Sequence, residues 1–257
     1  MANSPTELPV RFLDGADGLP LAVREMGEGR PLVLLHGLFS SAFTNWIRFG
    51  HAQHLAAAGF RVIMPDLRAH GESAAPHDAD AYPPDILADD GLALLAQLGL
   101  DDGDYDLGGY SLGARTTARM LVKGARPRRA ILAGMGLDGM RDTGSRAEFF
   151  RRVLRDFGSH ERGTGEWMAE AFLKTTGGDR LALLPLLDSF VDTSDAELRG
   201  IMVETLVLCG IDDHDNGSAS ALADMLPNGR YVSVPGNHMS AVVEVTLGQR
   251  MADFLTT

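Results

Sequence analysis

Ser111 lies at the centre of Gly109-Tyr110-Ser111-Leu112-Gly113, where an expected strand at 105–110 gives way to an expected helix at 111–123. This is a GxSxG pattern in the strand-to-helix context that a nucleophilic serine needs. The turn lifts the hydroxyl to a helix N-terminus, where partial positive charge favours a developing anion. The flanking glycines let strand and helix approach without a side-chain clash. The pattern predicts a nucleophile at Ser111, with a glycine-rich turn of no catalytic role as the alternative.

A serine hydroxyl attacks well only when a base takes its proton, and that base is usually a histidine held by a carboxylate. His238 follows the last expected strand, in a loop leading to the C-terminal helix, and we predict that it is the base. The other histidines that we weighed lie on an early helix or in polar stretches and are expected to be solvated: His51, His54, His77 and His160.

The expected strand at 205–209 ends in Gly210-Ile211-Asp212-Asp213-His214-Asp215. Asp213, three residues past the glycine, is the predicted acid, because a short loop lets its carboxylate turn back toward His238. Asp212 and Asp215 compete with it, and Asp138, which follows an earlier strand, is a further alternative.

Short apolar runs alternate with helical stretches along the chain, as in a parallel sheet that is covered on both faces. A hairpin signal at Asp17-Gly18 precedes them. The prediction is an α/β fold with a doubly wound, mostly parallel sheet and an antiparallel start. The expected strands are 10–13, 19–24, 32–35, 60–64, 105–110, 129–133, 205–209 and 230–234, and the expected helices are 45–58, 85–98, 111–123, 218–225 and 239–255.

Residues 139–200 interrupt this alternation. One helix face runs from Phe149 to Phe157 and another covers 167–173, with no expected strand between them. We therefore expect a core formed by 1–138 and 201–257, with 139–200 inserted as a helical lid.

The chain resembles the α/β-hydrolase superfamily over essentially its whole length. The order serine, acid, histidine is that of the family. Supporting motifs are His36-Gly37-Leu38-Phe39 and the stretch 65–73, in which Ala69 stands where the family usually has glycine. The resemblance implies that the backbone N–H groups of Leu38 and Leu112 form an oxyanion hole.

The composition of the chain argues against several classes of binding partner. Lys and Arg number 23 against 35 Asp and Glu, so the formal charge is −12, which disfavours nucleic acid and anionic membrane surfaces as partners. No apolar run approaches the roughly 20 residues of a membrane span, and residues 1–10 show no secretory signal. The single cysteine, Cys209, allows no intramolecular disulfide and no thiolate-rich metal site. These features favour a cytoplasmic enzyme that acts on a small molecule.

Three further patterns have ordinary explanations. The GxGxxG match at 134–139 lies late in the chain with no convincing helix inside it, so no dinucleotide site is expected. The acidic runs 101–104 and 212–215 lack calcium-loop spacing, so neither a metal nor another cofactor is expected. Arg115, Arg119 and Lys123 follow at four-residue steps, and we expect acidic partners for them, in preference to anion recognition by Arg115.

The predicted function is hydrolysis of a small to medium carboxylic ester through an acyl-enzyme on Ser111. Thioesters, lactones or a carbon–carbon bond are alternative substrates, and a ligand-binding protein on the same scaffold is an alternative class. Tyr110 and Met239 replace the Asn and Trp typical of carbon–carbon hydrolases, and a serine at 111 excludes the aspartate chemistry of epoxide hydrolases and haloalkane dehalogenases. Apolar residues of the lid predict an apolar pocket: Met140, Phe149, Phe150, Trp167, Met168 and Phe172.

Overall fold

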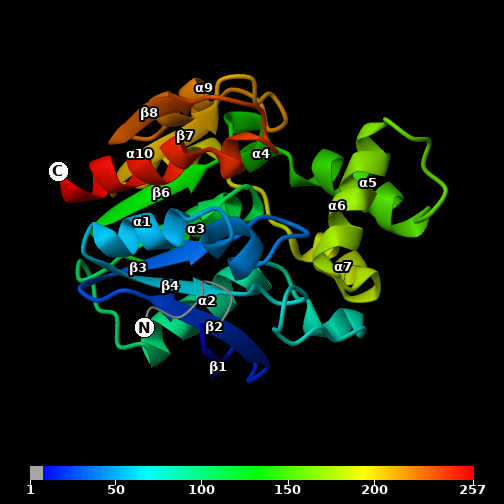
Figure 1. Cartoon of the computed structure of the whole chain (residues 1–257), viewed down its shortest axis with the longest axis horizontal. Helices are drawn as coiled ribbons and strands as arrows, with labels where there is room; N and C mark the ends of the chain where they lie inside the picture. Colours follow the sequence, from blue (N-terminus) through cyan, green and yellow to red (C-terminus); the bar gives the residue numbers. More distant parts are fainter. Residues whose placement is uncertain (1–7) are drawn as a thin grey trace.

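A single sheet of eight strands runs through the computed structural model, which describes residues 8–257 (Figure 1). The strand order is β1-β2-β4-β3-β5-β6-β7-β8. The β1–β2 and β2–β4 pairs are antiparallel and the other pairs are parallel, which confirms the predicted fold class. The strands are β1 (Val10–Asp14), β2 (Pro20–Met26), β3 (Arg30–Leu35), β4 (Phe60–Pro65), β5 (Asp106–Tyr110), β6 (Arg129–Ala133), β7 (Glu204–Gly210) and β8 (Gly229–Val234).

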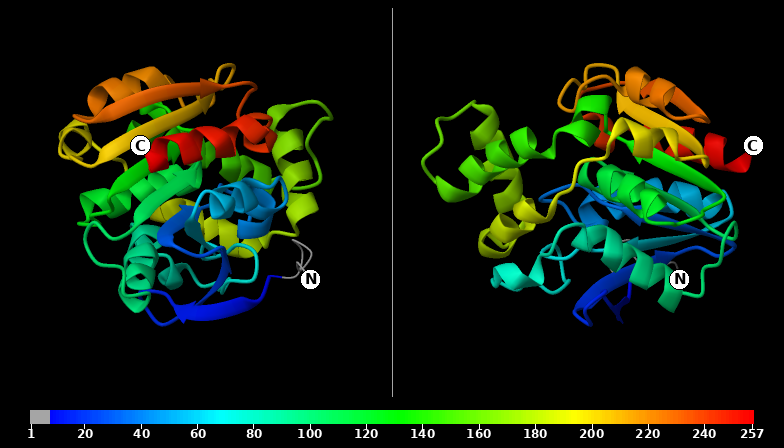
Figure 2. Two further views of the ribbon diagram at one scale, coloured as in Figure 1. Left: turned by 60° about the vertical axis from the view of Figure 1, so that its left-hand side comes forward. Right: turned by 180° about the vertical axis from the view of Figure 1, so that it is seen from behind.

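Helices cover both faces of this sheet (Figures 1 and 2). One face packs against α1 (His51–Ala57) and α10 (Val245–Thr256), and the other against α2 (Ile86–Gln97), α3 (Leu112–Val122) and α9 (Ala219–Met225). Successive residues of β3 alternate between the two cores, because side chains of a strand point to opposite faces in turn. Both cores are apolar, so β3 places apolar side chains on both faces from Leu32 to Leu35, as the sequence indicated.

Between β6 and β7 the chain forms five short helices, here called the helical segment (residues 137–199). In Figures 1 and 2 its middle helices stand clear of the sheet, beyond the edge at which β5 and β6 end. The two helix faces expected at Phe149–Phe157 and 167–173 fall on α5 and α6, whereas a moving lid stays a prediction. The helices are α4 (Leu137–Arg141), α5 (Thr143–Arg155), α6 (Gly165–Thr176), α7 (Arg180–Leu186) and α8 (Asp195–Arg199).

Two expected helices differ from the structure. Residues 45–58 do not form one helix, because Gly50 takes a left-handed φ of +82° between a π-helical turn at Phe43–Ile47 and α1. The C-terminal helix begins at Val245 rather than at 239. The side chain of Asn237 accepts hydrogen bonds from the N–H groups of Met239 and Ser240, which holds that stretch in a turn.

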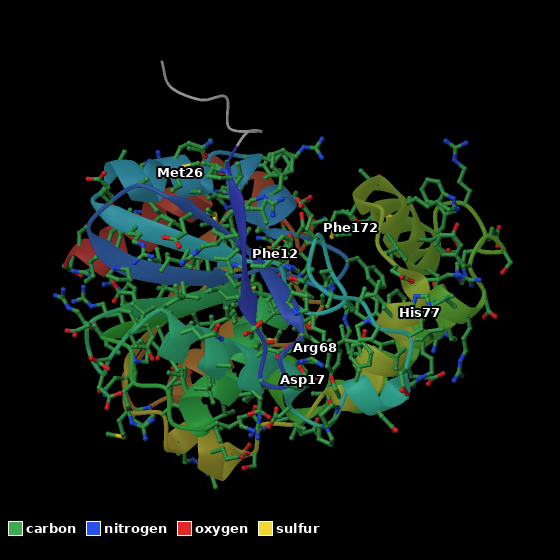
Figure 3. All side chains as sticks on the ribbon, turned by 90° about the horizontal axis from the view of Figure 1, so that it is seen from below. Phe12, Asp17, Met26, Arg68, His77 and Phe172 are labelled. Atoms are coloured by element: carbon green, nitrogen blue, oxygen red, sulfur yellow. The ribbon has the colours of Figure 1, made fainter. Side chains whose placement is uncertain are left out.

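The loop after β4 is held by the buried side chain of Arg68. Its guanidinium donates to Asp17 at 2.6 Å and to Asp90 at 2.8 Å, and thereby joins the β1–β2 turn to α2 (Figure 3). Ala69, next in the chain, adopts φ +66°, the left-handed conformation that glycine adopts most easily. The turn expected of this motif is therefore kept despite the alanine.

Candidate active site

Ser111 follows the last residue of β5 and precedes α3. Its φ of +55° and ψ of −112° form a strained turn, in which its N–H donates to the carbonyl of Ala133 at 2.8 Å. The side chain does not cap the helix, so the hydroxyl is available for another partner.

Glycines on both sides make this turn possible. A Cβ atom on Gly113 would lie 2.1 Å from the carbonyl oxygen of Leu35, and one on Gly109 would lie 2.2 Å from the carbonyl carbon of Gly113. Neither position has room for a side chain, which agrees with the role that the sequence indicated for them.

His238 bridges the serine and a carboxylate. Its Nε2 atom lies 3.0 Å from Oγ of Ser111, and its Nδ1 atom lies 2.8 Å from Oδ2 of Asp213. The ring is mostly buried, and Asp213 is almost completely so. The structure thus brings the three sequence-predicted residues into one hydrogen-bonded chain.

The Asp213 carboxylate has several donors. Burial opposes its ionisation, but hydrogen bonds from His238, from the backbone N–H of Asp215 and from the Cys209 thiol together hold its pKa below the ordinary value. An ionised carboxylate at Nδ1 fixes the ring with its proton on Nδ1 and leaves Nε2 as an acceptor facing the serine.

The other acid candidates lie elsewhere. Asp212 and Asp138 are exposed, and Asp215 forms an ion pair with Arg146 at 2.9 Å. Within residues 8–257 none of the three makes a hydrogen bond to His238.

Two of the histidines expected to be solvated are not. His51 is buried against Trp46, and its Nε2 donates to the carbonyl of Val242 at 2.6 Å, because α1 packs against the C-terminal helix. His160 is largely covered, with Nε2 3.2 Å from the carbonyl of Val153. His54 is exposed, and His77 is a half-exposed partner of Asp179. None of these four rings reaches Ser111 in the described chain.

Tyr110, beside the nucleophile, supports the histidine loop. Its hydroxyl donates to the carbonyl of His238 at 2.6 Å, and the two ring centroids lie 5.4 Å apart. Burial raises the pKa of the phenol well above its ordinary value, so Tyr110 remains a donor at neutral pH. No sequence pattern indicated this contact, since it joins residues far apart in the chain.

The loop carrying Leu38 is rigidly held. His36 donates from Nδ1 to the carbonyl of Gly37 at 2.8 Å and accepts the Leu67 N–H at Nε2 at 2.9 Å. His70 likewise accepts the Phe39 N–H at 3.2 Å. Burial lowers the pKa of both rings, that of His70 to about 3, so they are neutral acceptors.

Leu38 and Leu112 line the same cleft as Ser111, and their backbone N–H groups are free to donate in the described chain. Within residues 8–257 the N–H groups of Leu38 and Leu112 have no hydrogen-bond acceptor. Leu112 is the first residue of α3, where an N–H has no partner within the helix. Two such groups beside a nucleophile can bind the oxygen of a polarised carbonyl.

Among residues 8–257, two pockets border Ser111. The larger of these two has a volume of about 160 Å³, is also lined by His238, and is here called the larger pocket. Asn45, which the sequence did not single out, is buried in its wall. Its Oδ1 accepts the Gly37 N–H at 3.1 Å, whereas its Nδ2 has no partner in the described chain. Phe172 lies between α6 and the sheet body (Figure 3). The remaining lining is mainly apolar, from Leu38, Phe49, Tyr110, Met239, Val242 and Val243.

A narrower cleft of about 20 Å³ lies on the other side of Ser111 and is here called the Arg115 cleft. Phe150 lines it, as Phe172 lines the larger pocket, so two of the six predicted apolar residues reach a pocket wall. Met140 is instead fully buried in the core, and Met168 points to solvent. The cleft is lined by Leu38, Ser111, Leu112, Arg115, Met135, Arg146, Phe150, Phe190 and Asn216.

The expectation of ion pairs along α3 is confirmed for two cations and wrong for the third. Arg119 lies 2.6 Å from Asp85, and Lys123 lies 2.7 Å from Asp89. Arg115 has no carboxylate within 4 Å among the residues that the structure describes. Its guanidinium instead donates to the carbonyl of Gly139 at 2.7 Å, and the residue lines the Arg115 cleft.

The glycines of 134–139 have a packing role. A Cβ atom on Gly136 would lie 2.2 Å from the carbonyl oxygen of Gly217, so the loop after β7 requires glycine there. A helix does begin inside this stretch, at Leu137, contrary to expectation, but it spans only Leu137–Arg141. Over residues 8–257, no group of three or more His, Cys, Asp or Glu side chains is placed to hold a metal ion, and no helix is long and apolar enough to cross a bilayer.

The chain is similar to proteins of known class. A model of the alpha/beta hydrolase family matches residues 32–245. A non-heme haloperoxidase from Rhodococcus erythropolis is 28% identical, over 88% of this chain and 91% of that protein. An epoxide hydrolase from Caballeronia sordidicola is 39% identical, over 32% of this chain and 24% of that one. The solved structure of a thermophilic esterase from Thermogutta terrifontis superposes with a TM-score of 0.78 at 23% identity, covering 96% of this chain and 98% of that one.

Proposed function

Because the chain belongs to the alpha/beta hydrolase family, we propose that it cleaves small to medium carboxylic esters through an acyl-enzyme on Ser111. The hydrogen-bonded chain from Ser111 Oγ through His238 to Asp213, with distances of 3.0 and 2.8 Å, carries this proposal. Such a chain converts a poorly nucleophilic hydroxyl into one that attacks a carbonyl carbon.

In the first half-reaction, Nε2 of His238 takes the hydroxyl proton as Oγ of Ser111 bonds to the ester carbonyl carbon. The carbonyl oxygen becomes an oxyanion, which accepts hydrogen bonds from the N–H groups of Leu38 and Leu112. The carbon–oxygen bond to the alcohol then breaks. The leaving oxygen takes the proton from Nε2, and the acyl group stays on Ser111.

In the second half-reaction, water gives a proton to Nε2 of His238 and its oxygen bonds to the acyl carbon. The bond from that carbon to Oγ of Ser111 then breaks, and Oγ takes the proton back, which releases a carboxylic acid. Asp213 holds the proton on Nδ1 and stabilises the imidazolium formed in each half-reaction. The proposed reaction uses no cofactor.

The helical segment is proposed to act as the lid over this site. Phe150 and Phe172 come from its α5 and α6 and form walls on the two sides of Ser111.

The substrate is a small molecule in this proposal. The net charge of −12 works against nucleic acid and anionic membranes as partners, and we place the enzyme in the cytoplasm.

Thioesters and lactones present the same carbonyl to the same groups, so they remain alternative substrates. Epoxide opening, the activity named for the Caballeronia relative, is not proposed, because a hydroxyl instead of a carboxylate stands at the nucleophile position. A non-catalytic binding role would leave the contact between Ser111 and His238 without a purpose.

The experiment is labelling with a fluorophosphonate probe, followed by mass spectrometry of the modified peptide. We expect Ser111 alone to be labelled at neutral pH, and Ser111→Ala and His238→Ala to lose labelling, because only an activated hydroxyl attacks phosphorus quickly. Labelling of another serine, or none, would contradict the proposal. Hydrolysis of p-nitrophenyl esters of graded acyl length, beside thioester, lactone and halide-peroxide assays, then defines the substrate.

A further inference from the structure

Arg115 is a buried cation without a counterion. The residue is 5% exposed, and no carboxylate of residues 8–257 lies within 4 Å of its guanidinium. Its Nη2 donates to the carbonyl of Gly139 at 2.7 Å, and its guanidinium lies 5.4 Å from the ring centroid of Phe190. Its Nε is buried without any hydrogen-bond partner. Leaving a buried charge uncompensated is costly, so this arrangement calls for an anion.

The two carboxylates that act on Arg115 electrostatically form no ion pair with it. Asp192 acts on it only at longer range and accepts the Thr143 N–H at 2.8 Å, and Asp142 caps α5 by accepting the Ser145 N–H at 2.9 Å. Burial lowers the pKa of Arg115 to about 10, which still leaves the side chain charged at neutral pH.

The position of Arg115 ties this charge to the reaction. It lies one helical turn after Ser111, about 6 Å along α3, and both line the Arg115 cleft. Arg146, a second cation on the cleft wall, is paired with Asp215 at 2.9 Å. The cleft is narrow, at about 20 Å³, so it favours a small end group over a bulky one. A carboxylate is a compact organic anion, and it can accept two hydrogen bonds from a guanidinium.

The two sides of Ser111 receive different parts of an ester. His238 must protonate the leaving alcohol, and it lines the larger pocket but not the Arg115 cleft. A group in the cleft therefore belongs to the acyl part of the substrate.

We infer that Arg115 binds a carboxylate on the acyl part of the substrate, so that the preferred substrates are half-esters of short dicarboxylic acids or lactones that carry a carboxylate. This inference rests on the proposed esterase function. The overall charge of −12 repels anions, so recognition of an anionic acyl group depends on this local cation.

The test compares monoethyl glutarate with ethyl hexanoate, in which an ethyl group replaces the carboxylate. We expect the wild type to give the higher kcat/KM with monoethyl glutarate. In Arg115→Gln the ratio of the two kcat/KM values should fall by about 10- to 100-fold, the usual cost of losing a hydrogen bond to a charged group. Arg115→Lys should retain part of the preference. Arg250→Gln, which removes the same charge from an exposed position of α10, should keep the wild-type ratio.

A purely structural role for Arg115, as a support for Gly139, would lower both kcat/KM values together and leave their ratio unchanged, which would overturn the inference. If Arg115→Gln does not fold, the wild-type measurement still tests the inference. A higher kcat/KM with ethyl hexanoate than with monoethyl glutarate contradicts a carboxylate site.

A binding measurement separates this inference from the esterase proposal. Glutarate should bind to Ser111→Ala in calorimetry, and its affinity should fall at least about tenfold when Arg115→Gln is added. If glutarate binds but the wild type is not labelled by the fluorophosphonate, only the esterase proposal is contradicted. If Ser111 is labelled and ethyl hexanoate is hydrolysed but glutarate does not bind, only the carboxylate site is contradicted.

Discussion

The carboxylate of Asp213 lies 2.8 Å from Nδ1 of His238, although two other aspartates stand within two residues of it in the sequence. The loop after β7 turns Asp213 inward while Asp212 and Asp215 remain exposed. One residue of this acidic cluster therefore holds the histidine, and the others contact solvent or a neighbouring cation.

Asp213→Asn should reduce kcat by about 10⁴, the loss seen when the carboxylate is removed from an otherwise intact serine protease. The reason is that an amide cannot stabilise the imidazolium and favours the wrong tautomer of His238. The check is kcat with one ester, with circular dichroism as evidence of folding. Asp212→Asn, Asp215→Asn and Asp138→Asn serve as matched controls and should stay close to the wild-type rate. If kcat falls strongly in Asp138→Asn but stays near the wild-type value in Asp213→Asn, the catalytic acid is Asp138, in the loop after β6.

The pH profile of kcat/KM should rise from acidic toward neutral pH, because a protonated His238 cannot accept the serine proton. The pKa of Asp213 is held below its ordinary value by its hydrogen bonds, so this carboxylate stays ionised over the range and adds no second step. His238→Ala should lose this activity while remaining folded. A near wild-type rate in His238→Ala would mean that another base acts.

The free energy of unfolding should fall as the pH is lowered from 7.5 to 5.5. Burial lowers the pKa of His70 from 6.5 to about 3, so over this range the unfolded chain takes up a proton that the folded protein does not. Neutral His70 contributes its full stabilisation to the folded protein above pH 6.5, and this contribution is lost as the pH falls toward 3. The loss in the free energy of unfolding is about 1 kcal/mol at pH 5.5. Urea denaturation at both pH values measures the loss.

His70→Gln should reduce that pH dependence by about 1 kcal/mol, because glutamine does not titrate. His54→Gln, at an exposed position of α1, should keep the wild-type dependence. An unchanged dependence in His70→Gln would show that His70 takes up its proton equally in both states.

Gly113→Ala should destabilise the protein by about 3 kcal/mol or more, because its Cβ would lie 2.1 Å from a carbonyl oxygen of β3. Backbone atoms cannot move aside as a flexible side chain can. Gly144→Ala is the matched control. It lies in α5 with no atom closer than 3.7 Å to the added carbon, and should raise stability by at most about 1 kcal/mol. Equal denaturation midpoints for the two variants would contradict the close packing.

The local pattern of the sequence was sufficient to predict the eight strands, the doubly wound sheet and the elbow at Ser111. Apolar runs, glycines and turn residues act on neighbours a few positions away, so their consequences can be predicted without the fold. The same pattern indicated that His238, after the last strand, would return to Ser111, and the structure places their atoms 3.0 Å apart.

Tertiary structure decided the questions in which two distant segments meet. His51 is buried because α1 packs against a carbonyl 191 residues later, and Arg119 finds Asp85 and Glu197 at separations of 34 and 78 residues. Arg115, one turn earlier on the same helix, meets no carboxylate within 4 Å in the described chain. Charge spacing along a helix states which groups need partners, but the partners come from elements whose positions depend on the packing of the whole sheet.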